Sequence, residues 1–162
     1  MLAEVAATTF PLACPPTATQ EAIADFIGKN LALTNFEGYL SDPARRLFLA
    51  IEDGAAIGYA MLVLAEPTDP DVAAAITLHP AAELSKLYVR AGHHGAGISV
   101  ALVNAAVDAA RQVGSAGMWL GVNEQNSRAN RFYEKNGFVR VGTKKFRLGE
   151  TYEDDFVRER AL

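Results

Sequence analysis

The stretch from Glu83 to Gly114 constrains the fold of this chain more than any other. A strand-like segment, residues 83–89, runs into a turn with three glycines between Gly92 and Gly97, and a helical pattern then continues to Gly114. The apolar stripe of that pattern consists of Ile98, Leu102, Ala105, Ala109 and Val113. Unpaired backbone N–H groups at such a helix start favour a phosphate or pyrophosphate ligand. A flexible turn before a helix is the alternative.

Two common nucleotide loops do not fit this turn. A P-loop requires Gly-Lys-Ser/Thr, and no lysine stands between Val89 and Ser99. The dinucleotide fingerprint requires a third glycine at or near Val100, and none is present. His93 and His94 have no Cys, Asp or Glu at ligand spacing, so we expect no metal site.

The region before residue 45 is expected to be mainly helical. Thr17 and Gln20 form a capping-box pattern for a helix with apolar residues on one face, and a second helix is expected over 36–40, ending before Pro43. The apolar face of the first helix consists of Ile23, Phe26, Ile27 and Leu31. We also expect a first strand before residue 10.

Strand patterns dominate from Arg46 onward. Residues 47–52 and 57–64 flank the turn signal Asp53-Gly54 and predict a hairpin, whereas 66–80 is expected to begin as a loop. Beyond the glycine turn we expect a strand at 118–122, a helix at 127–136 with Ala129, Phe132 and Tyr133 inward, and strands at 138–148 and 153–160. This order predicts an α/β fold in which helices cover both faces of a mixed sheet.

Composition limits the class of protein. The 162 residues are half hydrophobic and about a fifth charged, which suits one domain spanning 1–162. The net charge of −4 and the lack of a Lys/Arg run argue against nucleic-acid and membrane surfaces. Apolar stretches such as 55–65 are too short to span a bilayer, and the first residues lack a basic signal-peptide region, so a cytoplasmic protein is expected. Cys14 is the only cysteine, so no intramolecular disulfide can form.

Two sequence blocks resemble the GNAT superfamily of acetyl-CoA-dependent N-acetyltransferases. The first is Glu83-Leu84-x-x-Leu87-Tyr88-Val89 followed by His94-Gly95-Ala96-Gly97-Ile98-Ser99, which is similar to the family's fourth strand and its pyrophosphate loop, Q/R-x-x-G-x-G/A. The second is Leu120-Gly121-Val122-x-x-x-Asn126-x-x-Ala129-x-x-Phe132-Tyr133-x-x-x-Gly137-Phe138, which is similar to the fifth strand and the next helix. The resemblance implies a single-domain, mostly antiparallel sheet of six to seven strands.

The resemblance also implies where acetyl-CoA binds. Backbone amides of the glycine turn would hold the pyrophosphate, the end of the strand would pair with the pantetheine arm, and Asn126 would contact that arm or orient its helix. The implied set is Leu87, Tyr88, Val89, His94, Gly95, Ala96, Gly97, Ile98, Ser99 and Asn126. His94 and Ser99 depart from the family pattern, in which Gln or Arg and Gly or Ala are usual.

Tyr133 and Glu83 are the candidate catalytic residues. The resemblance places Tyr133 near the acetyl-CoA sulfur, and a tyrosine is protonated at neutral pH and can donate to a departing thiolate. Glu83 is the candidate base for the amine, with Glu124 a weaker one. The structural alternatives are a core aromatic for Tyr133 and a solvated carboxylate for Glu83. Neither step requires a metal.

The acceptor is less defined. The segment 119–122, the Tyr133 helix and the acidic cluster Glu153-Asp154-Asp155 resemble PaiA-type spermidine/spermine acetyltransferases, so a small primary amine, with a polyamine as one candidate, is expected. A solvated charge run is the alternative for the cluster. A non-catalytic acyl-CoA-binding or sensing module and a protein or peptide acetyltransferase remain open as functions. Dimers are common in the family, so a homodimer is a further expectation, although the sequence marks no interface.

Overall fold

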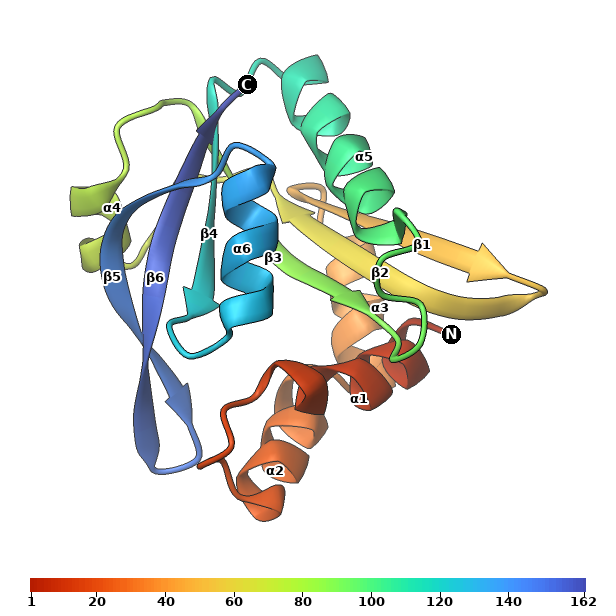
Figure 1. Cartoon of the computed structure of the whole chain (residues 1–162). Coiled ribbons are helices and arrows are strands. Elements are labelled where there is room, and N and C mark those ends of the chain that lie inside the picture. The colour runs from red at the N-terminus through yellow and green to blue at the C-terminus, as the bar shows by residue number, and fades with distance from the viewer.

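The computed structural model describes residues 1–162, and its centre is one six-stranded sheet of order β1-β2-β3-β4-β6-β5 (Figure 1). The strands are β1 (Arg45–Glu52), β2 (Ala55–Val63), β3 (Ala81–Val89), β4 (Gly117–Asn123), β5 (Val139–Leu148) and β6 (Thr151–Ala161). The helices are α1 (Leu2–Ala13), α2 (Gln20–Asn30), α3 (Leu33–Ser41), α4 (Pro70–Ala75), α5 (Ile98–Gln112) and α6 (Ser127–Lys135). Only the β3–β4 pair is parallel. The expected fold class, a mostly antiparallel α/β sheet, is confirmed.

Helices cover both faces of the sheet, so β2 is buried on both sides. Tyr59 packs in a core with Val5 of α1 and Phe36 of α3, whereas its neighbour Ala60 packs in a core with Val103 of α5. Successive side chains of a strand point to opposite faces, so these two cores lie on opposite sides of β2. The strand is therefore apolar along nearly its whole length instead of alternating.

The β3–β4 join is short. Only three residue pairs hold the two strands together: Ala81 with Gly117, Ala82 with Met118 and Glu83 with Trp119. Beyond them β3 continues beside β2 and β4 continues beside β6, so the two strands diverge (Figure 1). The β2–β3 register shifts between Met61 and Leu62, which leaves Ser85 without a partner, and such bulges bend a strand. The divergence opens the sheet at its centre.

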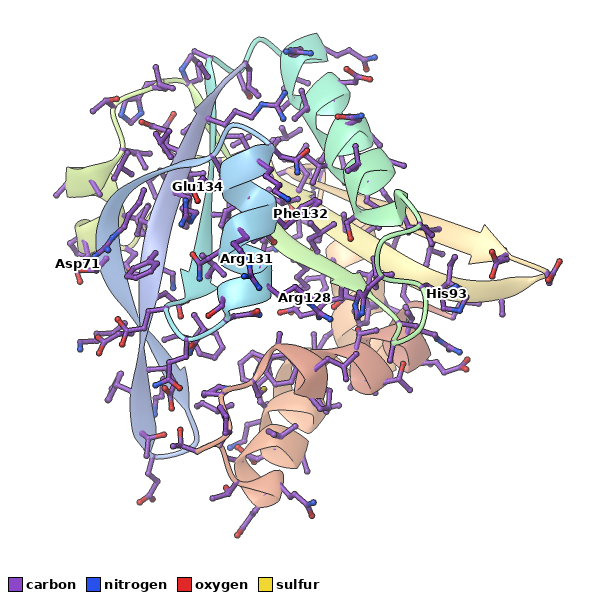
Figure 2. All side chains as sticks on the ribbon, in the orientation of Figure 1. Asp71, His93, Arg128, Arg131, Phe132 and Glu134 are labelled. Atoms are coloured by element: carbon purple, nitrogen blue, oxygen red, sulfur yellow. The ribbon has the colours of Figure 1, made fainter.

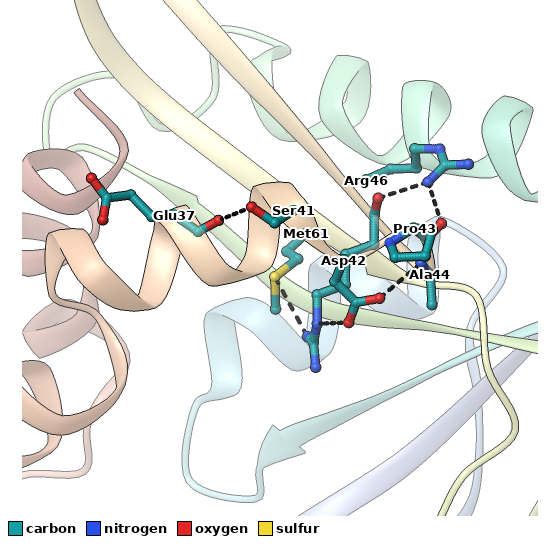
Figure 3. A network of polar contacts seen from close by, with 8 residues as sticks. Glu37, Ser41, Asp42, Pro43, Ala44, Arg46 and Met61 are labelled. Atoms are coloured by element: carbon teal, nitrogen blue, oxygen red, sulfur yellow. Dashed lines mark hydrogen bonds and ion pairs between the residues drawn. The ribbon is translucent and has the colours of Figure 1, made fainter.

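A polar network around Asp42 ties α3 to β1 (Figure 3), and it also fixes Arg45. The Asp42 carboxylate accepts hydrogen bonds from the backbone N–H of Ala44 at 2.9 Å and from Nε of Arg45 at 3.0 Å. These contacts, led by the Ala44 N–H, lower the pKa of Asp42. The Arg45 guanidinium also contacts Sδ of Met61 at 3.7 Å and lies 4.9 Å from the centre of the Tyr39 ring. Arg45 is thereby held as a fixed cation over β2.

The N-terminal part of the chain corrects two expectations. The strand expected before residue 10 is wrong: residues 2–13 form α1, because Val5, Ala6 and Phe10 are spaced to face the β2 core from a helix. The first turn of α2 is capped by Thr19 in place of the expected Thr17, since Thr19 Oγ1 accepts from the N–H of Ala22 at 3.1 Å.

Two other segments differ in detail from the sequence-based expectation. The loop expected over 66–80 contains α4, which Asp69 caps ahead of Pro70. The buried face of α5 is rotated from the expected stripe: Leu102 is buried, but Val113 is exposed. The residues that α5 buries are Leu102, Val103, Ala106, Val107 and Ala110. An alanine-rich helix gives several similar apolar stripes, so its pattern alone does not fix the face.

None of the helices combines the length and the apolar character needed to cross a lipid bilayer.

Candidate active site

Two cavities meet where β3 and β4 diverge. The first, here called the loop cavity, has a volume of about 330 Å³ and lies between the end of β3, the turn before α5 and the start of α6. The second, the hairpin cavity, has a volume of about 240 Å³ and lies between β3, β4, the β5–β6 hairpin and helices α1 and α2. They share the lining residues Ala13, Leu87, Tyr88, Asn126, Ala129 and Tyr133.

The glycine turn forms one end of the loop cavity. Gly92, Gly95 and Gly97 all have positive φ, at 85°, 87° and 78°, a conformation that glycine adopts without strain. Gly97 is the N-cap of α5 and supplies no side chain, so the N–H groups of the first turn of the helix are free for a ligand.

The turn places most of the expected cofactor residues together. His94, Gly95, Gly97 and Ser99 line the loop cavity with Leu87, Tyr88 and Val89 of β3. Ala96 and Ile98 do not line it. Ile98 packs against the α5 core instead, because its side chain faces the sheet.

The start of α6 faces this turn and contributes a residue that the sequence analysis missed. Asn126 is the N-cap of α6, and its Oδ1 accepts from the N–H of Ala129 at 3.1 Å. Arg128 lies at the start of α6 (Figure 2) and lines the loop cavity. Its Nη1 lies 3.0 Å from Nδ1 of His94. Because a guanidinium only donates, Nδ1 of His94 is the acceptor in this contact. The available signal was the position of Arg128 in the first turn of α6, two residues after Asn126.

Tyr133 and Tyr88 lie at the junction of the two cavities. The Tyr133 ring packs edge-on against Phe132 and Phe138, with centroid distances of 5.4 and 5.8 Å. Tyr88 stacks on Tyr59 at 5.7 Å. Burial raises the pKa of both Tyr88 and Tyr133 above the ordinary value, so both hydroxyls stay protonated at neutral pH. The Tyr59 hydroxyl is sealed in the core without a partner, whereas the hydroxyls of Tyr88 and Tyr133 are not sealed.

Charged side chains form the floor of the hairpin cavity. Glu83 and Lys86 come from β3, Lys144 from β5, and Glu153 and Asp155 from β6. Burial raises the pKa of Glu83, against the opposing effect of Lys144, Lys86 and Arg45. Burial lowers the pKa of Lys86, against the opposing effect of Glu83. Glu83, the predicted base, therefore lies near three cations at a position that is partly shielded from water. Glu124, the weaker candidate, is exposed and lines neither cavity.

Asp155 is the most buried carboxylate of this floor. Its side chain is only 9% exposed, and its Oδ2 lies 3.8 Å from Nζ of Lys144. Burial raises the pKa of Asp155 to about 6, although Lys144 opposes the shift. A Cβ at Gly121 would lie 2.5 Å from Cε of Lys144 and 3.2 Å from Oδ2 of Asp155. Glycine at position 121 thus leaves room for this ion pair.

The acidic cluster 153–155 does not act as a unit. Glu153 and Asp155 line the hairpin cavity, whereas Asp154 lies on the other face of β6 and pairs with Lys145. This division follows from the alternation of side chains along a strand. The cavity therefore receives two of the three carboxylates expected to face an acceptor.

Apolar side chains from separate elements also line the hairpin cavity. Phe10 of α1 and Phe26 of α2 stack at 4.4 Å with nearly parallel rings, and Phe146 of β5 lies 5.4 Å from Phe26. Cys14 also lines the cavity, but burial raises the pKa of its thiol to about 11. A thiol that stays protonated at neutral pH is a poor nucleophile.

These features define a class of protein. A sheet that diverges at its centre, with uncapped N–H groups of a helix start at one cavity and carboxylates lining the other, suits an acyl-CoA-dependent transferase. The Acetyltransferase (GNAT) family pattern matches residues 11–138. The chain belongs to this family and is an N-acetyltransferase, as the sequence blocks predicted.

Known relatives agree in sequence and in fold. An uncharacterized N-acetyltransferase of Mycobacterium tuberculosis is 47% identical over 161 residues, which is 99% of this chain and 96% of that protein. The crystal structure of PaiA N-acetyltransferase from Thermoplasma acidophilum in complex with coenzyme A has a TM-score of 0.77 at 23% identity, covering 99% of this chain and 91% of that one. A ribosomal-protein-alanine N-acetyltransferase from Brucella melitensis has a TM-score of 0.66 at 21% identity, covering 83% and 82%. The two structures establish likeness of fold.

The buried carboxylate of Asp155 predicts a pH-dependent stability difference. Its pKa of about 6 in the folded protein, against 3.8 ordinarily, means that the folded state binds the proton more tightly and loses stability as pH rises between these values. Asp155→Asn should therefore be more stable than the wild type at pH 7 to 8, by on the order of 1–3 kcal/mol, and equal to it below about pH 4. Urea unfolding across this pH range measures the difference.

Asp154→Asn is the matched control, since Asp154 is exposed and pairs outside the cavity. It should change stability by less than about 1 kcal/mol at any pH. An Asp155→Asn difference that is constant with pH, or a loss of stability at pH 7, would contradict the assignment of a desolvated carboxylate.

Proposed function

We propose that this protein transfers the acetyl group of acetyl-CoA directly to a primary amine of a small molecule. The observation that carries the proposal is the meeting of two cavities at Tyr88 and Tyr133, one with an anion cradle and one with buried carboxylates. A donor in the loop cavity would place its thioester at this junction, within reach of an amine in the hairpin cavity. Polyamines, amino acids, aminoglycosides and peptides are the acceptor classes to compare.

In this proposal the loop cavity holds CoA. The backbone N–H groups from His94 to Ser99 bind the pyrophosphate, and the end of β3, Leu87–Val89, pairs with the pantetheine arm beside Asn126. Ala96 and Ile98 then contribute only through their backbone, because their side chains do not line the cavity. Ser99 adds a hydroxyl that can donate to a phosphate oxygen.

Arg128 compensates for the departure at position 94. The family pattern places Gln or Arg there, and this chain has the shorter His94. Arg128 reaches the same place from α6 and contacts the His94 ring, so a guanidinium is still present at the phosphate cradle. Guanidinium–phosphate hydrogen bonds are charge-assisted and frequently bidentate, which makes Arg128 the stronger of the two donors.

This role predicts that Arg128→Ala weakens CoA binding by about 3- to 30-fold, because a partly exposed charge-assisted contact is lost. Isothermal titration with CoA measures the effect, which should shrink at high salt. Arg131→Ala is the matched control: Arg131 stands on the same helix, lines neither cavity and should leave the affinity unchanged (Figure 2). Equal effects of both substitutions would contradict a specific contact.

The proposed chemistry has three proton transfers. The ammonium of the acceptor, with a pKa of roughly 10, loses a proton to Glu83, directly or through water, and the free amine attacks the thioester carbonyl to give a tetrahedral intermediate. The C–S bond then breaks, and the CoA thiolate takes a proton from the Tyr133 hydroxyl. The nitrogen of the new amide loses its extra proton, which returns to the Tyr133 oxygen directly or through water. Burial raises the pKa of both groups, so Glu83 accepts protons at higher pH than an ordinary glutamate and Tyr133 stays a donor well into the alkaline range.

Two substitutions separate these roles. Tyr133→Phe should lower kcat by about 10- to 1,000-fold with little change in CoA affinity, because only the proton donor is removed. Glu83→Gln should remove the acidic limb of the kcat/KM profile, along which wild-type activity falls as pH drops through the raised pKa of Glu83. Steady-state rates from pH 5 to 10 measure both. Full turnover by Tyr133→Phe when chemistry limits the rate would contradict its role as acid.

The function itself is tested by release of the CoA thiol from acetyl-CoA in the presence of an amine panel. Acetylation of a small amine, identified by mass spectrometry of the product, supports the proposal. Acetyl-CoA binding without turnover on any amine or peptide would favour a sensing module, and turnover on peptides alone would favour a protein acetyltransferase.

A further inference from the structure

We infer that the acceptor carries a single positive charge on an apolar or aromatic body, so that monoamines are preferred over polyamines and over zwitterionic amino acids. The inference rests on the proposed function and concerns the hairpin cavity alone. It follows from how the charges on the cavity floor are paired and from the apolar side chains that line the same cavity.

Few carboxylates of the floor lack a cationic neighbour. Its carboxylates are Glu83, Glu153 and Asp155, and its cations are Lys86 and Lys144. Lys144 lies 3.8 Å from Asp155, and Lys86 is the neighbour whose charge Glu83 stabilises. The lining therefore has one carboxylate in excess. That excess matches one ammonium group.

The cation Arg45 adds to this effect. Arg45, held by Asp42 and Met61, lies close enough to Glu83 and Lys86 to stabilise the negative charge of Glu83 and to disfavour the positive charge of Lys86. A second or third ammonium in this cavity would lose its hydration beside lysines whose carboxylate partners are already engaged. The same lysines do not offer a free site for an acceptor carboxylate.

The apolar part of the lining favours an apolar body. Phe10, Phe26 and Phe146 come from three elements and pack at 4.4 and 5.4 Å, and Leu31 and Leu148 also line the cavity. Phe146 adjoins the charged floor, because Nζ of Lys144 lies 5.8 Å from the centre of its ring. An aromatic or alkyl group placed here is removed from water against apolar surface, at about 25 cal/mol for each Å² buried. With its body against these side chains, a monoamine can direct its nitrogen toward the carboxylates that line the same cavity.

The direct test compares amines matched in length that differ in charge. We expect kcat/KM at saturating acetyl-CoA to be at least tenfold higher for hexylamine than for 1,6-diaminohexane, although the diamine offers two reactive ends. We expect 2-phenylethylamine to exceed both phenylalanine and spermidine by a similar factor. A preference for the diamine, for spermidine or for phenylalanine would overturn the inference.

A substitution on the floor tests the electrostatic cause. Lys144→Gln removes one cation and leaves Asp155 unpaired, so the ratio of kcat/KM for the diamine to that for hexylamine should rise by at least threefold. Lys145→Gln is the matched control, because Lys145 is the next residue of β5 and pairs with Asp154 outside the cavity. Its ratio should equal the wild-type ratio, and a Lys144→Gln ratio that also stays at the wild-type value would overturn the electrostatic argument.

The outcomes separate this inference from the proposed function. If the wild-type enzyme acetylates the diamine or spermidine best, the transferase function stands and only the acceptor assignment fails. If it acetylates none of the amines although acetyl-CoA binds, the proposed function fails and the inference falls with it. The wild-type comparison does not depend on the stability of any variant.

Discussion

The parallel join of β3 and β4 is the constraint on which the site depends. Three residue pairs hold these strands together, and beyond Glu83 each strand continues with a different neighbour. The backbone at the end of β3 is thus left free on one side, next to the glycine turn that begins α5. The divergence therefore creates both the free strand edge and the space beside the glycine turn. The two cavities meet there, and α6 places Tyr133 at the meeting point.

Buried charge is the second organising feature, and it differs between the cavities. The loop cavity presents donors: backbone N–H groups, the His94 ring and the Arg128 guanidinium. The hairpin cavity presents carboxylates that are partly offset by lysines and by Arg45. An anionic cofactor and a cationic acceptor are consequently favoured on opposite sides of the junction. The same desolvation keeps Tyr88, Tyr133 and Cys14 protonated, so the site offers neutral hydroxyls and no thiolate.

Local sequence patterns predicted the parts of the fold that are encoded locally. Three such parts are the glycine turn, the strand before it and the Asn126–Tyr133 block, each of which lies within a short segment. Their residue types reflect local requirements: positive φ for the glycines, helix capping for Asn126 and burial for Tyr133. The α1 segment was misjudged because a run of Ala, Val and Thr suits a strand as well as a helix until Phe10 and Val5 are packed on β2. Glu83 and the cluster 153–155 were singled out from the sequence, but their meeting with Lys144 on one cavity floor was not predicted, because residues 83, 144 and 155 are brought together only by the strand order. Arg128 was missed for a similar reason, since its partner His94 is 34 residues away.

The central claim is that donor and acceptor occupy the two cavities together and react without an acetylated enzyme. The most direct measurement is the initial rate as the amine concentration is varied at several fixed concentrations of acetyl-CoA. Reciprocal plots that intersect to the left of the ordinate are the predicted result, because both substrates must be bound before transfer. Parallel lines, together with an acetylated protein detected by mass spectrometry when acetyl-CoA alone is present, would contradict the account and indicate a covalent intermediate.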